Sequence, residues 1–135
     1  MNLDRSMHLV LLMLAVPACT DRLVEPPFPY GTTAISPPVI YETWWHQVEE
    51  CAQVTSDYRS VHWYTVAGST VFTYNGDSEL EGYWLRNGNK ILIAGLLSND
   101  SLLVRHEELH ALLQTGQHPP LFFETRCGSL VAQGS

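Results

Sequence analysis

Basic residues are scarce in this sequence. Its 135 residues include 7 Lys and Arg against 14 Asp and Glu, which gives a formal net charge of −7. No cluster of basic residues interrupts this acidic balance, which argues against nucleic acid as a partner and against electrostatic docking on anionic lipid. Hydrophobic residues make up 45% of the chain and charged residues 16%, a composition typical of one small globular domain.

Long hydrophobic runs are also missing. The main apolar stretch, residues 8–16, is too short to span a bilayer and follows Arg5, as the core of a signal peptide would. It leads into Val-Pro-Ala-Cys at 16–19, which resembles a bacterial lipobox. We therefore expect residues 1–18 to be a lipoprotein signal peptide. The lipid on Cys19 would anchor a secreted protein to the bacterial cell envelope, in the periplasm or at the outer membrane. The alternative is an ordinary secretory signal that is cleaved nearby.

Cysteines are few. The chain has three, Cys19, Cys51 and Cys127, and no Cys-x-x-Cys pair, so a thiolate zinc site is not expected. If Cys19 carries a lipid, the other two form an even pair in an oxidising compartment, where a disulfide is expected. A bridge between Cys51 and Cys127 would stabilise so small a domain by about 4 kcal/mol, mainly by restricting the unfolded chain.

The distribution of proline suggests where the folded domain begins. Residues 19–38 contain several prolines and little periodicity. We predict that this stretch is the lipidated cysteine followed by a semi-extended tether, and that the folded domain covers residues 39–135. No internal repeat divides the domain.

Periodicity predicts the elements of the domain. Hydrophobic residues recur at helical spacing over 41–55, which predicts an amphipathic helix. The pattern changes to period two over 61–67, a second short strand is expected over 70–74, and a hairpin joins 83–86 to 90–94. The predicted fold class is α+β: an N-terminal helix, a small antiparallel sheet and then a second helix, with one disulfide.

The second predicted helix carries His-Glu-x-x-His, with His106, Glu107 and His110. Polar residues at 98–101 supply possible N-caps, and Gly116 supplies a stop. Because residues four apart lie on one face of a helix, His106 and His110 can present ring nitrogens to one metal ion. Glu107 then lies beside a water that the metal activates, where a general base for hydrolysis is needed.

At these residues the sequence resembles the zincin metallopeptidases. The resemblance implies zinc bound by His106 and His110, and hydrolysis of peptide bonds with Glu107 as the general base. The family's pattern asks for uncharged residues before the second His. Leu109 fits this pattern and Glu108 departs from it, a departure that is tolerable if Glu108 points to solvent. The alternative is a buried helix whose two histidines are only hydrogen-bonded.

A catalytic zinc ion usually has three protein ligands and one open position. The favoured third ligand is His118, because Gly116 lets the chain leave the helix and turn back towards the metal. The arrangement resembles the metzincin device, in which a glycine precedes a third histidine, although the spacing here is longer. The alternative third ligand is Glu124, as in gluzincin-like enzymes, and a site with neither residue is the remaining possibility.

The zincin resemblance also implies that an edge strand of the sheet binds an extended peptide by main-chain pairing. The strand at 90–94, just before the motif helix, is the expected edge; the alternative is that this hairpin only covers the core. Four side chains of the predicted sheet are candidates to stabilise an oxyanion. They are His62, Tyr64, Tyr74 and Tyr83.

The sequence thus predicts a secreted, lipid-anchored zinc metallopeptidase acting on a peptide or protein substrate. The alternative is a non-catalytic domain, zincin-like or with a structural zinc, that binds a peptide or protein partner at the cell envelope. Three ligands and an open position favour hydrolysis, whereas a fourth protein ligand would favour a structural metal.

Overall fold

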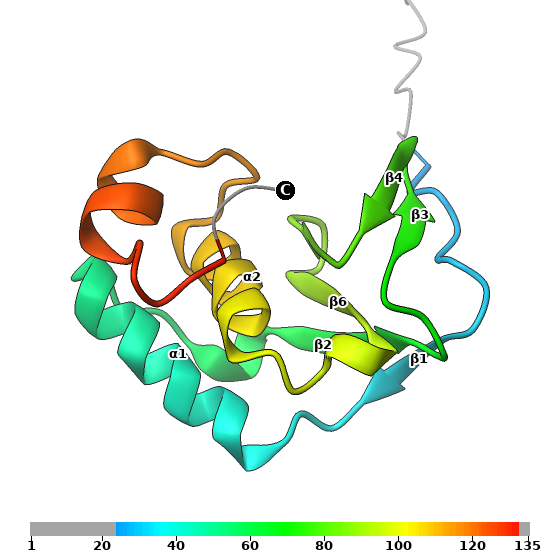
Figure 1. Cartoon of the computed structure of the whole chain (residues 1–135), viewed down its shortest axis with the longest axis horizontal. Helices are drawn as coiled ribbons and strands as arrows, with labels where there is room; N and C mark the ends of the chain where they lie inside the picture. Colours follow the sequence, from blue (N-terminus) through cyan, green and yellow to red (C-terminus); the bar gives the residue numbers. More distant parts are fainter. Residues whose placement is uncertain (1–23, 133–135) are drawn as a thin grey trace, which may run out of the picture.

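The structure is a computed structural model, and it describes residues 24–132. The predicted signal peptide, 1–18, and the predicted lipidation site, Cys19, lie outside these residues. The elements follow in the order β1 (Thr32–Ile35), α1 (Val39–Ala52), the short η1 (Tyr58–Ser60), β2 (His62–Val66), β3 (Phe72–Tyr74), β4 (Asp77–Leu80), β5 (Gly82–Leu85), β6 (Lys90–Ala94), η2 (Gly95–Leu97), α2 (Ser101–Leu113) and the π-helical η3 (Leu121–Arg126) (Figure 1). The α+β class is confirmed. Within residues 24–132, no helix is both long and apolar enough to cross a membrane.

Four strands form the main sheet, in the order β1-β2-β6-β5. The β1–β2 and β5–β6 pairs are antiparallel, and the predicted hairpin of 83–86 with 90–94 is present as β5 and β6. The central β2–β6 pair is parallel. This pairing explains the composition of β6, since a central strand covered on both faces reads as a continuous hydrophobic run. The run is Ile91-Leu92-Ile93-Ala94, and all four residues are buried.

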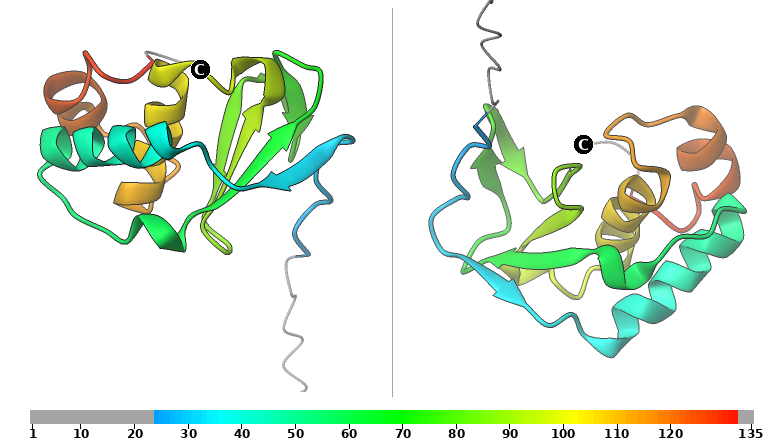
Figure 2. Two further views of the ribbon diagram at one scale, coloured as in Figure 1. Left: turned by 90° about the horizontal axis from the view of Figure 1, so that it is seen from below. Right: turned by 180° about the vertical axis from the view of Figure 1, so that it is seen from behind.

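The two faces of the sheet are covered by different elements. Alternate side chains of a strand point to opposite faces, so Ile91 and Ile93 pack under the helices, with Trp45 and Leu109, while Leu92 lies in a second, smaller core. The β3–β4 hairpin closes that second core. Figure 2 shows α1, α2 and η3 together on one side of the sheet and β3 and β4 on the other. Helix α2 lies between α1 and the sheet, where it contacts α1, β5 and β6.

The stretch predicted to be a tether is folded from residue 24 onward, so the prediction of a domain that starts at residue 39 is wrong. Strand β1 pairs with β2 along its whole length. The Phe28 ring lies 4.8 Å from that of Tyr64, and the carboxylate of Glu25 accepts from Lys90 Nζ at 2.8 Å. Proline did not exclude a strand here, because β1 lies at the edge of the sheet and the prolines fall outside its pairing residues.

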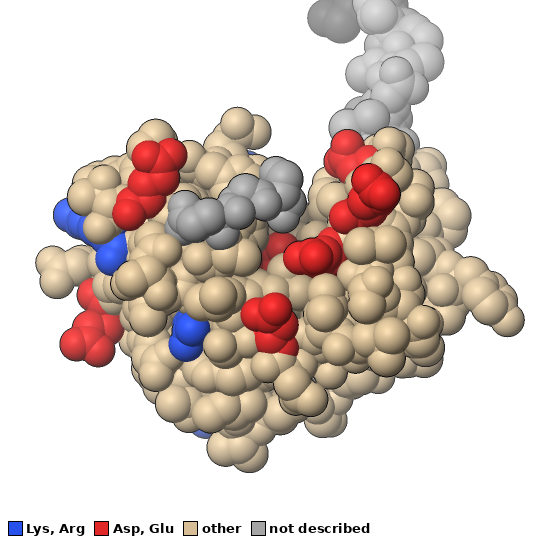
Figure 3. All heavy atoms as spheres, in the orientation of Figure 1, with Lys and Arg blue, Asp and Glu red and all other residues tan. Residues whose placement is uncertain are grey.

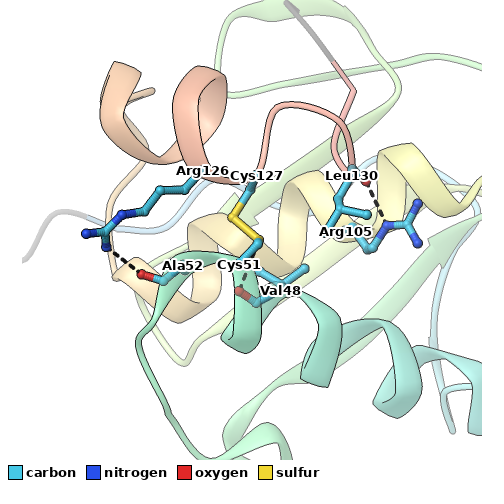
Figure 4. Close-up of a disulfide and its surroundings, with 7 residues drawn as sticks. All are labelled: Val48, Cys51, Ala52, Arg105, Arg126, Cys127 and Leu130. Atoms are coloured by element: carbon cyan, nitrogen blue, oxygen red, sulfur yellow. Dashed lines mark hydrogen bonds between the residues drawn. A yellow bond between two sulfur atoms is a disulfide. The ribbon is translucent and has the colours of Figure 1, made fainter.

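The predicted disulfide between Cys51 and Cys127 is confirmed. It joins the C-terminal end of α1 to the residue after η3, with the two Cα atoms 5.3 Å apart (Figure 4). Two arginines support the same connection: Arg126 donates to the Ala52 carbonyl at 2.8 Å, and Arg105 of α2 donates to the Leu130 carbonyl at 2.7 Å. The segment that follows the bridge is therefore held against both helices.

Candidate metal centre and active site

Helix α2 begins where its sequence provides a cap. The Asp100 side chain accepts hydrogen bonds from the backbone N–H groups of Leu102 and Leu103, which satisfies two donors that no carbonyl of the helix can reach. From Leu103 to Leu112 nearly every residue is buried. A helix covered on all sides holds its side chains rigidly, so the two histidines of the motif are positioned by packing on both flanks.

The helix ends differently from the prediction. Gln114, and not Gly116, takes the left-handed conformation, with φ of 54°. The Thr115 N–H then donates to the His110 carbonyl, and the chain turns back so that His118 reaches the motif. A left-handed non-glycine residue costs about 1–2 kcal/mol, and the buried contacts of α2 hold the turn in place. Gly116 lies on the rim of the cavity instead.

Three imidazole rings converge at the end of α2. His106 Nε2 lies 3.1 Å from His110 Nε2 and 3.0 Å from His118 Nε2. Among residues 24–132, these histidines form a group whose ligand atoms all lie within 4.8 Å of one another and can hold a metal ion. The structure thus brings together the three histidines predicted from the sequence. A tetrahedral zinc with bonds of about 2.0–2.1 Å separates its ligand nitrogens by about 3.3 Å, close to the spacing here.

The hydrogen bonds of Nδ1 in His106 and His110 determine the protonation state of Nε2 in the same rings. His106 Nδ1 donates to the Ala132 carbonyl at 2.9 Å, and His110 Nδ1 donates to the Thr115 carbonyl at 2.8 Å. A carbonyl only accepts, so the proton of each neutral ring must lie on Nδ1 and the Nε2 lone pairs face inward. Lone pairs directed at one another repel unless a cation lies between them. The rings are therefore in the tautomer of metal ligands, with backbone carbonyls that orient them.

An apolar environment keeps the His106 and His110 rings uncharged. The buried ring of Phe123, on η3, lies 5.1 Å from the His106 ring and 4.8 Å from each of the other two. Burial lowers the pKa of His110 to about 3, with a further contribution from the neighbouring His106. Burial likewise lowers the pKa of His106. Both rings are neutral at pH 7, as imidazole ligands must be.

Glu107 projects from the same helix towards β5 and is 5% exposed. Burial raises the pKa of its carboxyl to about 8. A cation held by the three histidines would favour the ionised form and bring that pKa down again. The carboxylate would then have the basicity that a proton acceptor needs.

A cavity of about 580 Å³ opens between α2 and the β4–β5 region. Its lining includes the three histidines, Glu107, and residues of β4 and β5: Asp77, Ser78, Leu80, Gly82, Tyr83 and Trp84. Figure 3 shows acidic side chains on the surface around β4, while the visible Lys and Arg side chains lie on the helical side of the molecule. One wall of the cavity therefore supplies imidazoles, and the other supplies strand backbone and the carboxylate of Asp77.

The edge strand beside this cavity is β5, so the prediction that the 90–94 strand forms the edge is wrong. Strand β6 is internal because β2 pairs with it in parallel on its far side, which the hydrophobic pattern alone did not indicate. A second hollow of about 320 Å³ shares Tyr83, Trp84 and Gly116 with the first. Together the two hollows form a groove that follows β5.

The remaining candidates lie outside the cluster. Glu124 is exposed on η3 and is not part of the histidine group that residues 24–132 contain. Of the oxyanion candidates, Tyr83 lines the cavity. Tyr74 is buried and donates to the Pro26 carbonyl, and Tyr64 packs on Phe28. His62 is exposed on β2 and does not line the cavity.

Glu108 does not point to solvent, so the condition under which its departure from the pattern is tolerable is not met. The residue is 0% exposed, and its two carboxyl oxygens have no hydrogen-bond partner among the described residues. Burial raises the pKa of this carboxyl well above its usual value, against the lowering effect of Arg105. Burial thus favours the protonated, uncharged form of this carboxyl.

Several contributors to the site left no signal in the sequence. The acceptors for His106 and His110 are backbone carbonyls, which any residue provides. Phe123 and Gly82 drew no prediction from the sequence. Their roles depend on tertiary packing, so only the structure reveals them.

The chain matches no protein-family model, no curated protein and no solved structure. The resemblance to zincins therefore rests on the motif and on the order of the elements around it.

Proposed function

We propose that this protein is a zinc-dependent peptidase. The observation that carries the proposal is the convergence of three Nε2 atoms beside a buried carboxylate, at the floor of a cavity whose other wall is an edge strand. Each of the three parts has a separate role in peptide hydrolysis: metal binding, proton transfer and substrate alignment.

Zinc is the metal that this donor set favours. Three imidazoles without a thiolate are common at catalytic zinc, which keeps an open fourth position, whereas structural zinc is usually closed by four protein ligands. Within residues 24–132, the candidate group contains three such ligands, and Glu124 does not join it. This argues against the structural-metal alternative.

A zinc ion held by these rings would act as a Lewis acid and lower the pKa of a water molecule towards about 7. Glu107 accepts the proton of the attacking water and later delivers it to the leaving amine. The Ala132 and Thr115 carbonyls hold His106 and His110 in their ligating orientation throughout. Low exposure of Glu107 and of the His106 and His110 rings keeps bulk water from competing for these protons.

The substrate that fits the groove is an extended peptide. Strand β5 pairs with β6 along one side, and its other side is the free edge of the four-stranded sheet. A peptide added to that edge makes main-chain hydrogen bonds and passes the histidine cluster. The same groove would serve a non-catalytic module that only binds a peptide or protein partner, so the two functions differ in the fate of the peptide.

Replacement of Glu107 by Gln separates these functions. Gln is nearly isosteric but cannot accept the proton, so we expect zinc and fold to be retained and hydrolysis of a peptide library to fall by about 10²–10⁴-fold. Zinc content and circular dichroism are the controls. Unchanged hydrolysis in Glu107→Gln would overturn the mechanism, and a wild-type protein that binds peptides without cleaving them would favour the binding module.

We also infer from the signal-like stretch 8–16 and the lipobox-like 16–19 that the protein is a cell-envelope lipoprotein. Four residues lie between Cys19 and residue 24, where the described structure begins, so the five Cα–Cα steps span at most about 18 Å. A lipid on Cys19 would hold the domain close to the membrane surface. In a bacterial host, labelled fatty acid should enter the wild-type protein and not Cys19→Ser; equal labelling of both would contradict this assignment.

A further inference from the structure

Gly82, at the start of β5, lies against the side chain of Glu107. A Cβ atom built on Gly82 would be 2.6 Å from Glu107 Oε1, 2.8 Å from its Cγ and 2.9 Å from its Cδ. Real Cβ atoms essentially never approach other atoms so closely. Gly82 does not take a left-handed backbone conformation. Space for the carboxylate, and not backbone freedom, is thus what glycine provides here.

The surroundings make this space specific. Glu107 extends from α2 towards β5, and the two elements pack directly on each other. The backbone of Gly82 is held by antiparallel pairing, with Ile93 as its partner. The side chain of Glu107 is 5% exposed, and the strand at Gly82 is one of the surfaces that cover it. The missing side chain of residue 82 leaves a slot, and the slot holds the carboxylate.

We propose that Gly82 is a positioning residue that fixes the Glu107 carboxylate beside the histidine cluster. The contact itself does not depend on any activity. Its catalytic consequence rests on the proposed peptidase function, in which Glu107 moves the proton. No atom of Gly82 needs to touch the substrate for this role.

Gly82→Ala changes the position of one side chain. The atoms that a new Cβ meets belong to the end of a flexible side chain, so the carboxylate swings away while the strand stays paired. Displacement of a catalytic group by about 1 Å can cost about 10²-fold in rate. The three atoms nearest to the new Cβ all belong to Glu107 and none to a histidine, so zinc binding is expected to persist.

The cavity offers a matched control. Gly116 lines the same cavity, and a Cβ built on it meets nothing within 4 Å. Gly116→Ala therefore makes the same chemical change on the other wall without a clash.

The contact is tested by a double-mutant cycle on the metal-free protein. Thermal unfolding is measured for wild type, Gly82→Ala, Glu107→Ala and the double variant. We expect Gly82→Ala to lower Tm when Glu107 is present and to leave Tm unchanged or raised in the Glu107→Ala background, because the clash is gone. If Gly82→Ala shifted Tm equally with Glu107 present and in the Glu107→Ala background, the proposed contact between Gly82 and Glu107 would be wrong.

The positioning role is tested on the zinc-loaded protein with a peptide library. Gly82→Ala should keep one zinc per chain and lose about 10²-fold in kcat with KM little changed. Gly116 lines the groove but has no contact with Glu107 at its Cβ position, so any effect of Gly116→Ala should fall on KM and not on kcat. Wild-type kcat in Gly82→Ala would overturn the role, as would a loss of zinc that accounts for the loss of rate. A wild-type protein that binds zinc but cleaves nothing overturns the peptidase function and the catalytic role of Gly82, while the stability cycle still decides the contact.

Discussion

The two walls of the cavity are built on opposite principles. On the helical wall, the rings of His106 and His110 are buried, hydrogen-bonded on their outer nitrogens and packed on Phe123. On the strand wall, Asp77 is exposed, and Gly82 has no side chain and so leaves room for the Glu107 carboxylate. The helical wall fixes a set of ligands, whereas the strand wall shapes space and presents charge. Changes to the first should cost metal or fold. If the peptidase function holds, changes to the second should cost activity while the metal is retained.

The largest effect is expected from removal of the disulfide that supports the helical wall. In the double variant Cys51→Ala/Cys127→Ala, the bridge no longer holds the segment that carries Ala132 against α1. We expect a loss of about 4 kcal/mol in unfolding free energy, by the chain-entropy account, and weaker zinc binding because the His106 ring loses its fixed acceptor.

Denaturant unfolding and competitive zinc titration measure the two consequences. Arg126→Ala removes a hydrogen bond at the same junction without opening the bridge, and it serves as the milder control. If the cysteine variant were less stable but bound zinc as tightly as wild type, the C-terminal segment would have no role in orienting His106.

The next effect concerns Glu108, whose carboxyl has a raised pKa in the folded protein. Its contribution to stability is fully present below the unfolded value of about 4.5 and is lost as pH rises towards the folded value. Each pH unit in this window costs about 1.4 kcal/mol. Glu108→Gln does not titrate, so the metal-free variant should lose less stability than wild type between pH 5 and 7.

Urea unfolding at several pH values measures this difference. Glu107 also has a raised pKa, to about 8, so Glu107→Gln is the matched variant that removes only its own share of the pH dependence. A Glu108→Gln profile parallel to wild type would show that the buried carboxyl does not titrate as described.

The smallest effect is expected from a change to Asp77 on the strand wall. Asp77 lines the cavity and is exposed, so it attracts a cationic side chain of a peptide only weakly. If the peptidase function holds, Asp77→Asn should lower kcat/KM for an Arg-containing peptide by about 2- to 5-fold and leave a neutral analogue unchanged. Added salt should shrink the difference. Equal losses on both peptides would assign Asp77 a structural role.

The same contrast explains what the sequence could predict. Helix α2, its cap region and the three histidines followed from local rules, since period, capping and the i, i+4 spacing are properties of a short stretch. The disulfide followed from counting cysteines. These features build the helical wall. They could be predicted because they depend on residue types and spacings within short stretches of sequence.

The strand wall depends on pairing between distant segments. Strand β1 is short and lies among prolines, and β4 is mostly polar, so neither showed a strand pattern. The identity of the edge depends on the parallel β2–β6 pairing, which no local pattern reports. The burial of Glu108 and the slot at Gly82 likewise arise only where helices and sheet meet.

The central claim is that His106, His110 and His118 form one metal site. Elemental analysis of the purified protein, folded in the presence of zinc, tests it most directly, with His118→Ala and Glu124→Ala measured beside wild type. We expect one zinc per chain in wild type and in Glu124→Ala, and a loss of zinc in His118→Ala. Zinc retained by His118→Ala and lost by Glu124→Ala, or a wild type without bound metal, would contradict it.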